Sequence, residues 1–331
     1  MEKSAVRRIG ILTSGGDAQG MNAAIRAAVR TASALGIECV GIRRGYTGLI
    51  SGDFFPMRNK DVKNITSRGG TILYTARSQE FMTDDGLKRA ADTCKYMGIE
   101  GLIAIGGDGT FKGALRLSEL GIKVIGVPCT IDNDIGCTTY TIGFDTACNT
   151  AIEAIDKLDD TMKSHERCSV VEVMGRSAGH LALNVGIATG ASVTLIPEAE
   201  VDFDRDVVEP IRSARLAGRT HFTVIVAEGV GIPHHTIADK IFEATGIEAR
   251  ATELGHLQRG GTPLARDRVI ASRMGYKAAL LLAEGCGNRV IVMDGDKCCD
   301  LDIADALTIE KDVDRDAYRL MSALTVGFGK S

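Results

Sequence analysis

The sequence predicts an α/β protein built from two doubly wound, Rossmann-like domains with mostly parallel sheets. Short apolar runs alternate with helix-length amphipathic segments along all 331 residues, which is the rhythm of β-α-β units. Glycine-rich loops follow directly after several of these runs, at the point where doubly wound folds bind ligands. The alternation restarts in the second half of the chain, and the length allows two domains of ordinary size.

The apolar runs are short, as buried parallel strands are. We expect strands at residues 8–13, 39–42, 102–105, 124–127, 168–174, 221–227 and 290–293. Between them, apolar residues recur three or four positions apart, which is the spacing of an amphipathic helix. We expect helices at about residues 21–35, 111–120, 146–163, 205–216, 237–244 and 263–283.

Composition narrows the class of protein. Hydrophobic residues make up 44% and charged residues 25%, as in an ordinary soluble enzyme. The net charge of -4 argues against a nucleic-acid partner. No apolar run reaches the roughly 18 residues of a membrane helix, so we expect no membrane partner. Nine scattered cysteines favour reduced thiols, and hence a cytoplasmic location.

Two carboxylates stand two residues apart at positions 130–134, where Thr-Ile-Asp-Asn-Asp follows an expected strand. Crowding like charges is costly, and loss of hydration adds to the cost. Such a cluster is tolerated if a cation lies nearby or if one carboxylate accepts a proton during turnover. The alternative is a solvated turn, since Asp and Asn are common turn residues.

A glycine-rich loop, Ile-Gly-Gly-Asp-Gly-Thr at 105–110, follows a strand and opens a helix. Glycines there let backbone N–H groups point at phosphate oxygens, and the helix N-terminus adds partial positive charge. Asp108 would repel a naked phosphate, so its presence implies a divalent cation, for which Mg²⁺ is the natural choice. The alternative is a tight turn in which Asp108 caps the helix. The loop 13–17, Thr-Ser-Gly-Gly-Asp, repeats the arrangement after the first strand, and its alternative is an ordinary first turn of a doubly wound sheet.

Basic residues gather near further glycines. They are Arg167, the Met-Gly-Arg of 174–176, Arg250 and the His-Leu-Gln-Arg-Gly-Gly of 256–261. Guanidinium groups suit phosphate dianions, so this set suggests a second anionic group apart from the metal-bound one. Each arginine taken singly could be a surface salt-bridge residue. Glu228 ends an expected strand, where a carboxylate can meet ligand hydroxyls.

In this order and spacing, from about residue 9 to residue 273, the motifs resemble those of bacterial, ATP-dependent 6-phosphofructokinases. The resemblance implies a glycolytic kinase, a transferase that moves a phosphoryl group from Mg²⁺-bound ATP to the 1-hydroxyl of fructose 6-phosphate. It also implies an allosteric homotetramer with active sites shared between subunits. The nucleotide-binding domain would cover 1–143 plus about 258–307, and the sugar-phosphate-binding domain 144–257 plus about 308–331.

The resemblance also implies a role for each matching position. Asp132 would be the general base, with Thr130 and Arg176 at the transferring group. Asp108 and Asp134 would contact the metal. The nucleotide would lie against Gly16, Arg77, Ser78, Gly107, Asp108, Gly109, Thr110 and Gly113. The sugar phosphate would lie against Thr130, Ile131, Asp132, Arg167, Met174, Gly175, Arg176, Glu228, Arg250, His256, Leu257, Gln258 and Arg259. Arg167 and Arg250 would reach over from a neighbouring subunit.

Two parts of the chain depart from the family's usual pattern. The first is the family's effector site, an allosteric pocket that binds a diphosphate nucleotide or phosphoenolpyruvate. Its usual residues are matched here by Arg26, Arg30, Arg219 and His221. Asn59, Asp159, Ala217 and Ser192 replace two arginines, a lysine and a glutamate that are usual there. We therefore expect weak or altered allosteric control.

The phosphoryl donor depends on two positions. ATP users carry glycine at both, whereas relatives that use pyrophosphate carry Asp at position 109 and Lys at position 129. Gly109 predicts ATP, and Cys129 fits neither pattern. The alternatives are a pyrophosphate-dependent phosphofructokinase or another kinase with a Gly-Gly-Asp-Gly loop, such as an NAD kinase. The sequence contains neither a P-loop nor a full Gly-x-Gly-x-x-Gly fingerprint, which disfavours a nicotinamide oxidoreductase.

Overall fold

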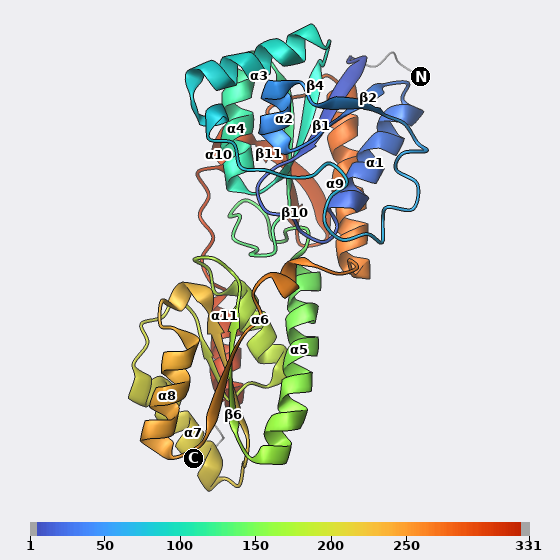
Figure 1. Cartoon of the computed structure of the whole chain (residues 1–331). Coiled ribbons are helices and arrows are strands. Elements are labelled where there is room, and N and C mark those ends of the chain that lie inside the picture. The colour runs from blue at the N-terminus through green and yellow to red at the C-terminus, as the bar shows by residue number, and fades with distance from the viewer. Residues whose placement is uncertain (1–4, 326–331) are drawn as a thin grey trace. The chain divides into compact units, whose positions relative to one another are not determined.

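The computed structural model describes residues 5–325, which form two compact units (Figure 1). Unit 1 contains the described residues up to Ile131, together with Ile135–Thr146 and Arg259–Lys311. Unit 2 contains Asp132–Asp134, Ala147–Gln258 and the described residues from Asp312. Apart from residues 132–134, the chain passes from one unit to the other after residues 146, 258 and 311. The segment 132–134, expected in the first domain, packs with unit 2 instead.

Unit 1 is built on a seven-stranded sheet of order β11-β10-β5-β4-β1-β2-β3. Its strands are β1 (Arg8–Thr13), β2 (Glu38–Ile42), β3 (Phe54–Met57), β4 (Gly101–Gly106), β5 (Lys123–Pro128), β10 (Arg289–Asp294) and β11 (Lys297–Asp302). The inner strands run parallel, and only β3 and β11, at the two edges, are antiparallel. Every residue of β4 is buried, as expected of a central parallel strand covered on both faces.

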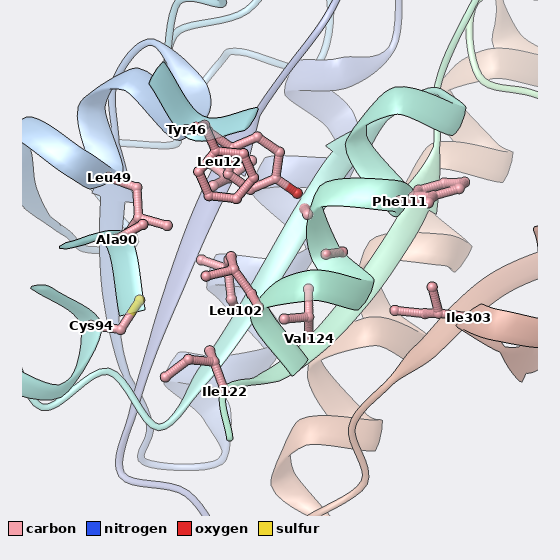
Figure 2. Close-up of a cluster of buried hydrophobic side chains, with 14 of the residues drawn as sticks. Leu12, Tyr46, Leu49, Ala90, Cys94, Leu102, Phe111, Ile122, Val124 and Ile303 are labelled. Carbon is pink, nitrogen blue, oxygen red and sulfur yellow. The ribbon is translucent and has the colours of Figure 1, made fainter. Parts of the chain in front are cut away.

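Helices cover this sheet. They are α1 (Met21–Ala34), α2 (Gly45–Ser51), the 3₁₀ turn η1 (Glu80–Met82), α3 (Asp84–Tyr96), α4 (Asp108–Glu119), α9 (Ala265–Ala283) and α10 (Ile303–Ala306). Apolar side chains of α2, α3, α4 and α10 pack with those of the strands in one cluster, which includes Leu102, Phe111 and Val124 (Figure 2). Each such side chain, fully buried, contributes roughly 1.5–3 kcal/mol. Helix α1 packs tightly on α9, where a Cβ at Gly275 would lie 2.3 Å from the carbonyl oxygen of Ala24.

Unit 2 has a four-stranded, fully parallel sheet of order β7-β8-β6-β9. Its strands are β6 (Cys168–Val173), β7 (Val193–Leu195), β8 (Phe222–Ala227) and β9 (Ala249–Glu253). Its helices are α5 (Phe144–His165), which starts in unit 1, α6 (His180–Thr189), α7 (Glu209–Leu216), α8 (His234–Thr245) and α11 (Arg315–Thr325). Short turns η2 (Asp204–Val208), η3 (Glu228–Val230) and η4 (Gly255–Arg259) complete it. One core cluster joins three strands of this sheet to α7 and α8.

All predicted strands and helices are present, with corrections to two helices. The helix expected at 205–216 begins as the π-helical turn η2, and α7 starts at Glu209. Pro210 lacks the N–H that would donate to the carbonyl of residue 206, so the chain cannot form a regular α-helical turn there. The helix expected at 237 already begins at His234. Among residues 5–325, no helix has the length and apolarity that crossing a membrane requires.

Candidate active site

Three loops meet at the carboxyl ends of β1, β4 and β5 in unit 1. The Ser14 N–H donates to the Ile105 carbonyl oxygen at 3.0 Å, and the Thr110 hydroxyl donates to the Ser14 carbonyl oxygen at 3.2 Å. The Cys129 N–H donates to the Gly106 carbonyl oxygen at 3.0 Å. The strand order reverses between β1 and β4, and doubly wound sheets bind ligands at such a switch point.

The glycine loop before α4 has two open positions. A Cβ at Gly107 or Gly109 would meet nothing within 4 Å, so the backbone there faces open space. The first N–H groups of a helix lack intrahelical partners and attract anions. Nearby glycines serve packing instead, since a Cβ at Gly113 would lie 2.7 Å from the Phe81 ring. Of the glycines predicted to contact the nucleotide, Gly107 and Gly109 are therefore open, whereas Gly113 packs against aromatic rings.

The carboxylate of Asp108 stands exposed at the start of α4. Among the described residues, no group of three or more His, Cys, Asp or Glu side chains could enclose a metal ion. A cation bound here would therefore need phosphate oxygens or water among its ligands. That is how Mg²⁺ is usually bound in nucleotide sites, so the donor set fits Mg²⁺.

The segment 71–78 is held beside the first glycine loop. The Thr13 hydroxyl donates to the Tyr74 carbonyl oxygen at 2.8 Å, and the Thr75 hydroxyl donates to the Gly15 carbonyl oxygen at 2.6 Å. These contacts bring the chain bearing Arg77 and Ser78 to the loop 13–17. The Ser78 hydroxyl oxygen itself accepts the Phe81 N–H at 3.2 Å.

Tyr46 contacts the first turn of α4, and no pattern in the sequence predicts this contact. Its ring stacks on Phe81 at 3.9 Å between centroids, and its hydroxyl donates to the Thr110 carbonyl oxygen at 2.6 Å. Both rings lie against Gly113. Tyr46 therefore fixes the first turn of α4, where the glycine loop 105–110 enters the helix.

Arg259 lies against the first glycine loop. Its Nη1 donates to the Asp17 carbonyl oxygen at 3.2 Å, and a Cβ at Gly16 would lie 2.6 Å from that nitrogen. Arg259 belongs to unit 1, whereas its predicted neighbours His256, Leu257 and Gln258 belong to unit 2. The absence of a side chain at Gly16 thus leaves room for the Arg259 guanidinium group.

The segment that leads to Asp132 is held by a second strand-like stretch. The Ile142 N–H donates to the Pro128 carbonyl oxygen at 3.1 Å, and the Thr141 hydroxyl donates to the Thr130 carbonyl oxygen at 2.7 Å. The Cys129 thiol donates to the Ile142 carbonyl oxygen at 3.4 Å. Burial raises the pKa of Cys129 well above its usual value, so the thiol is neutral. Asp132 is buried, with 7% of its surface exposed.

In unit 2, three loops meet at the carboxyl ends of β6, β8 and β9. Glu228 Oε1 accepts the Gly175 N–H at 3.1 Å and also the Arg176 N–H. Gln258 Oε1 accepts the Met174 N–H at 3.3 Å, and its Nε2 donates to a backbone carbonyl. Gln258 is fully buried, so its side chain positions the loops, whereas Leu257 is 69% exposed.

Arg167 and Arg250 lie at the opposite end of this sheet. Arg167 precedes β6, and Arg250 is paired in register with Ser169 near the start of that strand. Glu248 binds both guanidinium groups, with 2.8 Å between its Oε2 and Arg167 Nε. Seven strand positions separate Arg167 from Met174, or roughly 23 Å at about 3.3 Å per residue. One copy of the chain therefore does not bring all the predicted sugar-phosphate residues together.

The predicted effector residues occupy both units. Arg26 and Arg30 lie on α1 of unit 1, and Arg219 and His221 precede β8 in unit 2. Asp159 on α5 binds Lys163 at 2.7 Å and accepts the Thr223 hydroxyl at 3.3 Å. Its carboxylate also lies 3.8 Å from His221 Nε2.

Glycine turns at the carboxyl ends of parallel strands, one of them opening a helix, define a doubly wound α/β protein suited to holding phosphate groups. A family model described as phosphofructokinase matches residues 8–282, and the chain belongs to that family. It is 52% identical over 320 residues to the ATP-dependent 6-phosphofructokinases of Clostridium tetani and Clostridium botulinum, covering 97% of this chain and 100% of each relative.

Solved structures agree with this assignment. Phosphofructokinase from Saccharomyces cerevisiae superposes with a TM-score of 0.86 at 33% identity over 97% of this chain, which spans 47% of the yeast chain. A pyrophosphate-dependent phosphofructokinase from Nitrosospira multiformis superposes with a TM-score of 0.84 over 98% of this chain and 93% of its own. At 20% identity it shows a shared fold alone. The predicted family and fold class are confirmed.

Proposed function

We propose that the chain is an ATP-dependent 6-phosphofructokinase, which makes fructose 1,6-bisphosphate and ADP from fructose 6-phosphate and ATP in glycolysis. The observation that carries this proposal is the 52% identity, over the full length of the relatives, to proteins of that name. The open glycine loop before α4 supports it, because phosphoryl transfer depends on positioning and charge neutralisation more than on covalent help. We place the enzyme in the cytoplasm, as the sequence predicts.

In the proposed reaction, each site residue has its own role. Asp132 takes the proton from the 1-hydroxyl of the sugar as that oxygen attacks the γ-phosphorus of ATP. Thr130 and Arg176 contact the transferring group, and the guanidinium balances its developing charge. The helix N-terminus at Asp108 holds the nucleotide phosphates. Mg²⁺, held by Asp108 and Asp134 together with phosphate oxygens, would supply further neutralisation.

At positions 109 and 129, pyrophosphate users carry charged residues, whereas this chain carries the neutral residues Gly109 and Cys129. Gly109 leaves open space for the α-phosphate of ATP. Cys129 is fully buried and its thiol is neutral, so it brings no charge to the donor. A coupled assay for fructose 1,6-bisphosphate, run with ATP and with pyrophosphate, tests the proposal. We expect turnover with ATP, and a preference for pyrophosphate would overturn the choice of donor.

We propose that the active enzyme is a homotetramer in which two copies complete each sugar-phosphate site. Arg167 and Arg250 lie at the far end of the sheet from His256, so another copy must supply them. Glu248 binds both guanidinium groups and so keeps them close together, and guanidinium groups suit phosphate dianions.

Mixing two inactive variants tests this sharing. One carries Asp132→Ser, and the other carries Arg167→Ala with Arg250→Ala. After subunit exchange, sites that combine Asp132 of one variant with both arginines of the other should restore activity, up to about a quarter of wild type for random mixing. The exchange step is omitted in the control. No recovery in verified hybrids would show that one copy builds the whole site.

We propose that effector control is weak. Asp159 places a carboxylate, already bound by Lys163, where the family usually has an arginine. ADP or phosphoenolpyruvate at millimolar concentration should change the half-saturating fructose 6-phosphate concentration by less than about threefold, whereas allosteric couplings are typically about 5–150-fold. Titrations of rate against fructose 6-phosphate measure this shift. Strong ADP activation in the wild type would contradict the proposal, and Asp159→Arg should enlarge the response.

A further inference from the structure

Asp267, near the start of α9, is a fully buried carboxylate to which the proposed reaction assigns no role. Its Oδ1 accepts the Tyr140 hydroxyl at 2.6 Å and the Gly143 N–H at 2.7 Å. Its Oδ2 accepts the Thr146 N–H at 2.9 Å and the Thr146 hydroxyl at 2.5 Å. Four donors therefore converge on one side chain that lies more than a hundred residues further along the chain.

Two of these donors belong to the start of α5. The N–H groups in the first turn of a helix have no intrahelical partner, and a side-chain oxygen usually satisfies them locally. Here a carboxylate from another helix does so. The Thr146 hydroxyl also accepts the Leu264 N–H at 3.0 Å, which ties the network to the residue just before α9. Asp267 thus joins the starts of α5 and α9.

The same stretch supports the segment that leads to the proposed base. Thr141 and Ile142, between Tyr140 and Gly143, make the hydrogen bonds to Thr130 and Pro128 described above. Asp132 follows two residues after Thr130. A Cβ at Gly143, whose φ is 105°, would lie 2.6 Å from the Ala18 Cβ, so this stretch also packs closely on the residue that follows the first glycine loop.

The hydrogen bonds to Asp267 favour the charged form of its carboxyl group. Burial raises the pKa of Asp267, and the hydrogen bonds from Thr146, Tyr140 and the Gly143 backbone oppose that rise. Each carboxylate oxygen of Asp267 accepts a hydrogen bond from one backbone N–H, and a backbone N–H can only donate. Asparagine would turn its NH₂ group toward one of those N–H groups in either orientation, so it cannot replace aspartate here.

We infer that Asp267 is a positioning residue for phosphoryl transfer, which fixes the stretch 140–146 and through it the segment that carries Asp132. The inference rests on the proposed role of Asp132 as general base. Small misplacements of reacting groups cost up to about 100-fold in rate. Loss of this network should therefore act on turnover more than on substrate affinity.

Asp267→Asn tests the inference. We expect kcat to fall about 10- to 100-fold, with KM for ATP and for fructose 6-phosphate changed less than about threefold. In the Asp132→Ser background, the same substitution should change the residual kcat less than about twofold, because the group it positions is gone. Asp300→Asn is the matched control. Asp300 lies on the edge strand β11, where its carboxylate binds Lys277 and Arg289. Its loss should therefore leave kcat unchanged.

The outcomes separate this inference from the proposed function. An equal fall in kcat in both backgrounds would show general damage and overturn the positioning role. A wild-type kcat in Asp132→Ser would reject the proposed base itself. If Asp267→Asn does not fold, Tyr140→Phe removes a single donor, and an unchanged kcat in that variant would overturn the inference.

Discussion

Asp132→Ser should lower kcat by about 10²–10⁴-fold and leave KM for fructose 6-phosphate nearly unchanged. The hydroxyl of the sugar is a weak nucleophile until its proton is removed, and a positioned base contributes about that factor. Asp132 is buried and follows a segment that hydrogen bonds tie to the sheet of unit 1, and a serine at this position has no carboxylate to accept the proton. Steady-state kinetics with saturating ATP measure both parameters.

The control for this variant is Asp160→Ser, which makes the same change at an exposed position of α5. It should leave both parameters within experimental error of wild type. A nearly wild-type kcat for Asp132→Ser would reject Asp132 as the base. A large rise in KM with an unchanged kcat would instead assign it to ground-state binding.

Gly109→Asp should abolish most ATP-dependent activity without unfolding the protein. A Cβ at this position meets nothing within 4 Å, so the added side chain costs no packing. The carboxylate would face the α-phosphate of ATP, and two like charges about 5 Å apart repel by about 3 kcal/mol at an effective dielectric of 20. That energy corresponds to a loss of roughly 100-fold in kcat/KM for ATP.

Two further substitutions at the same position separate charge from volume. Gly109→Asn has the shape of aspartate without its charge, and Gly109→Ala adds only a methyl group. We expect the loss of kcat/KM to be largest for Asp, smaller for Asn and smallest for Ala. Thermal unfolding should give similar midpoints for all three. A Gly109→Asp enzyme that keeps its kcat/KM for ATP would show that this position does not face the donor.

Central parts of the fold could be predicted from the sequence, whereas its edges could not. Strands such as β4 are buried along their whole length, so they stand out as apolar runs. The edge strands β9 and β11 are partly exposed and rich in polar residues, so their sequences lack that signal. The apolar stripe of helix α3 is short and is interrupted by charged residues, so the sequence does not predict this helix either.

The candidate site was predictable where its residues are contiguous in sequence. The loops at 13–17, 105–110 and 130–134 each carry their chemistry in a few neighbouring residues. Tyr46 and Asp267 carry no such pattern, because their roles are defined by distant partners. Tyr46 binds the backbone of Thr110, 64 positions away, and Asp267 binds donors 121–127 positions away.

The sequence by itself determined the family and the order of the strands along the chain, since short-range patterns encode both. Only the tertiary structure decided which of the loops after the strands share a surface. It joined the loops after β1, β4 and β5, and it separated Arg167 and Arg250 from His256 by the length of β6. The physical reason is that strand direction and sheet order decide which chain ends meet, and both follow from packing between distant segments.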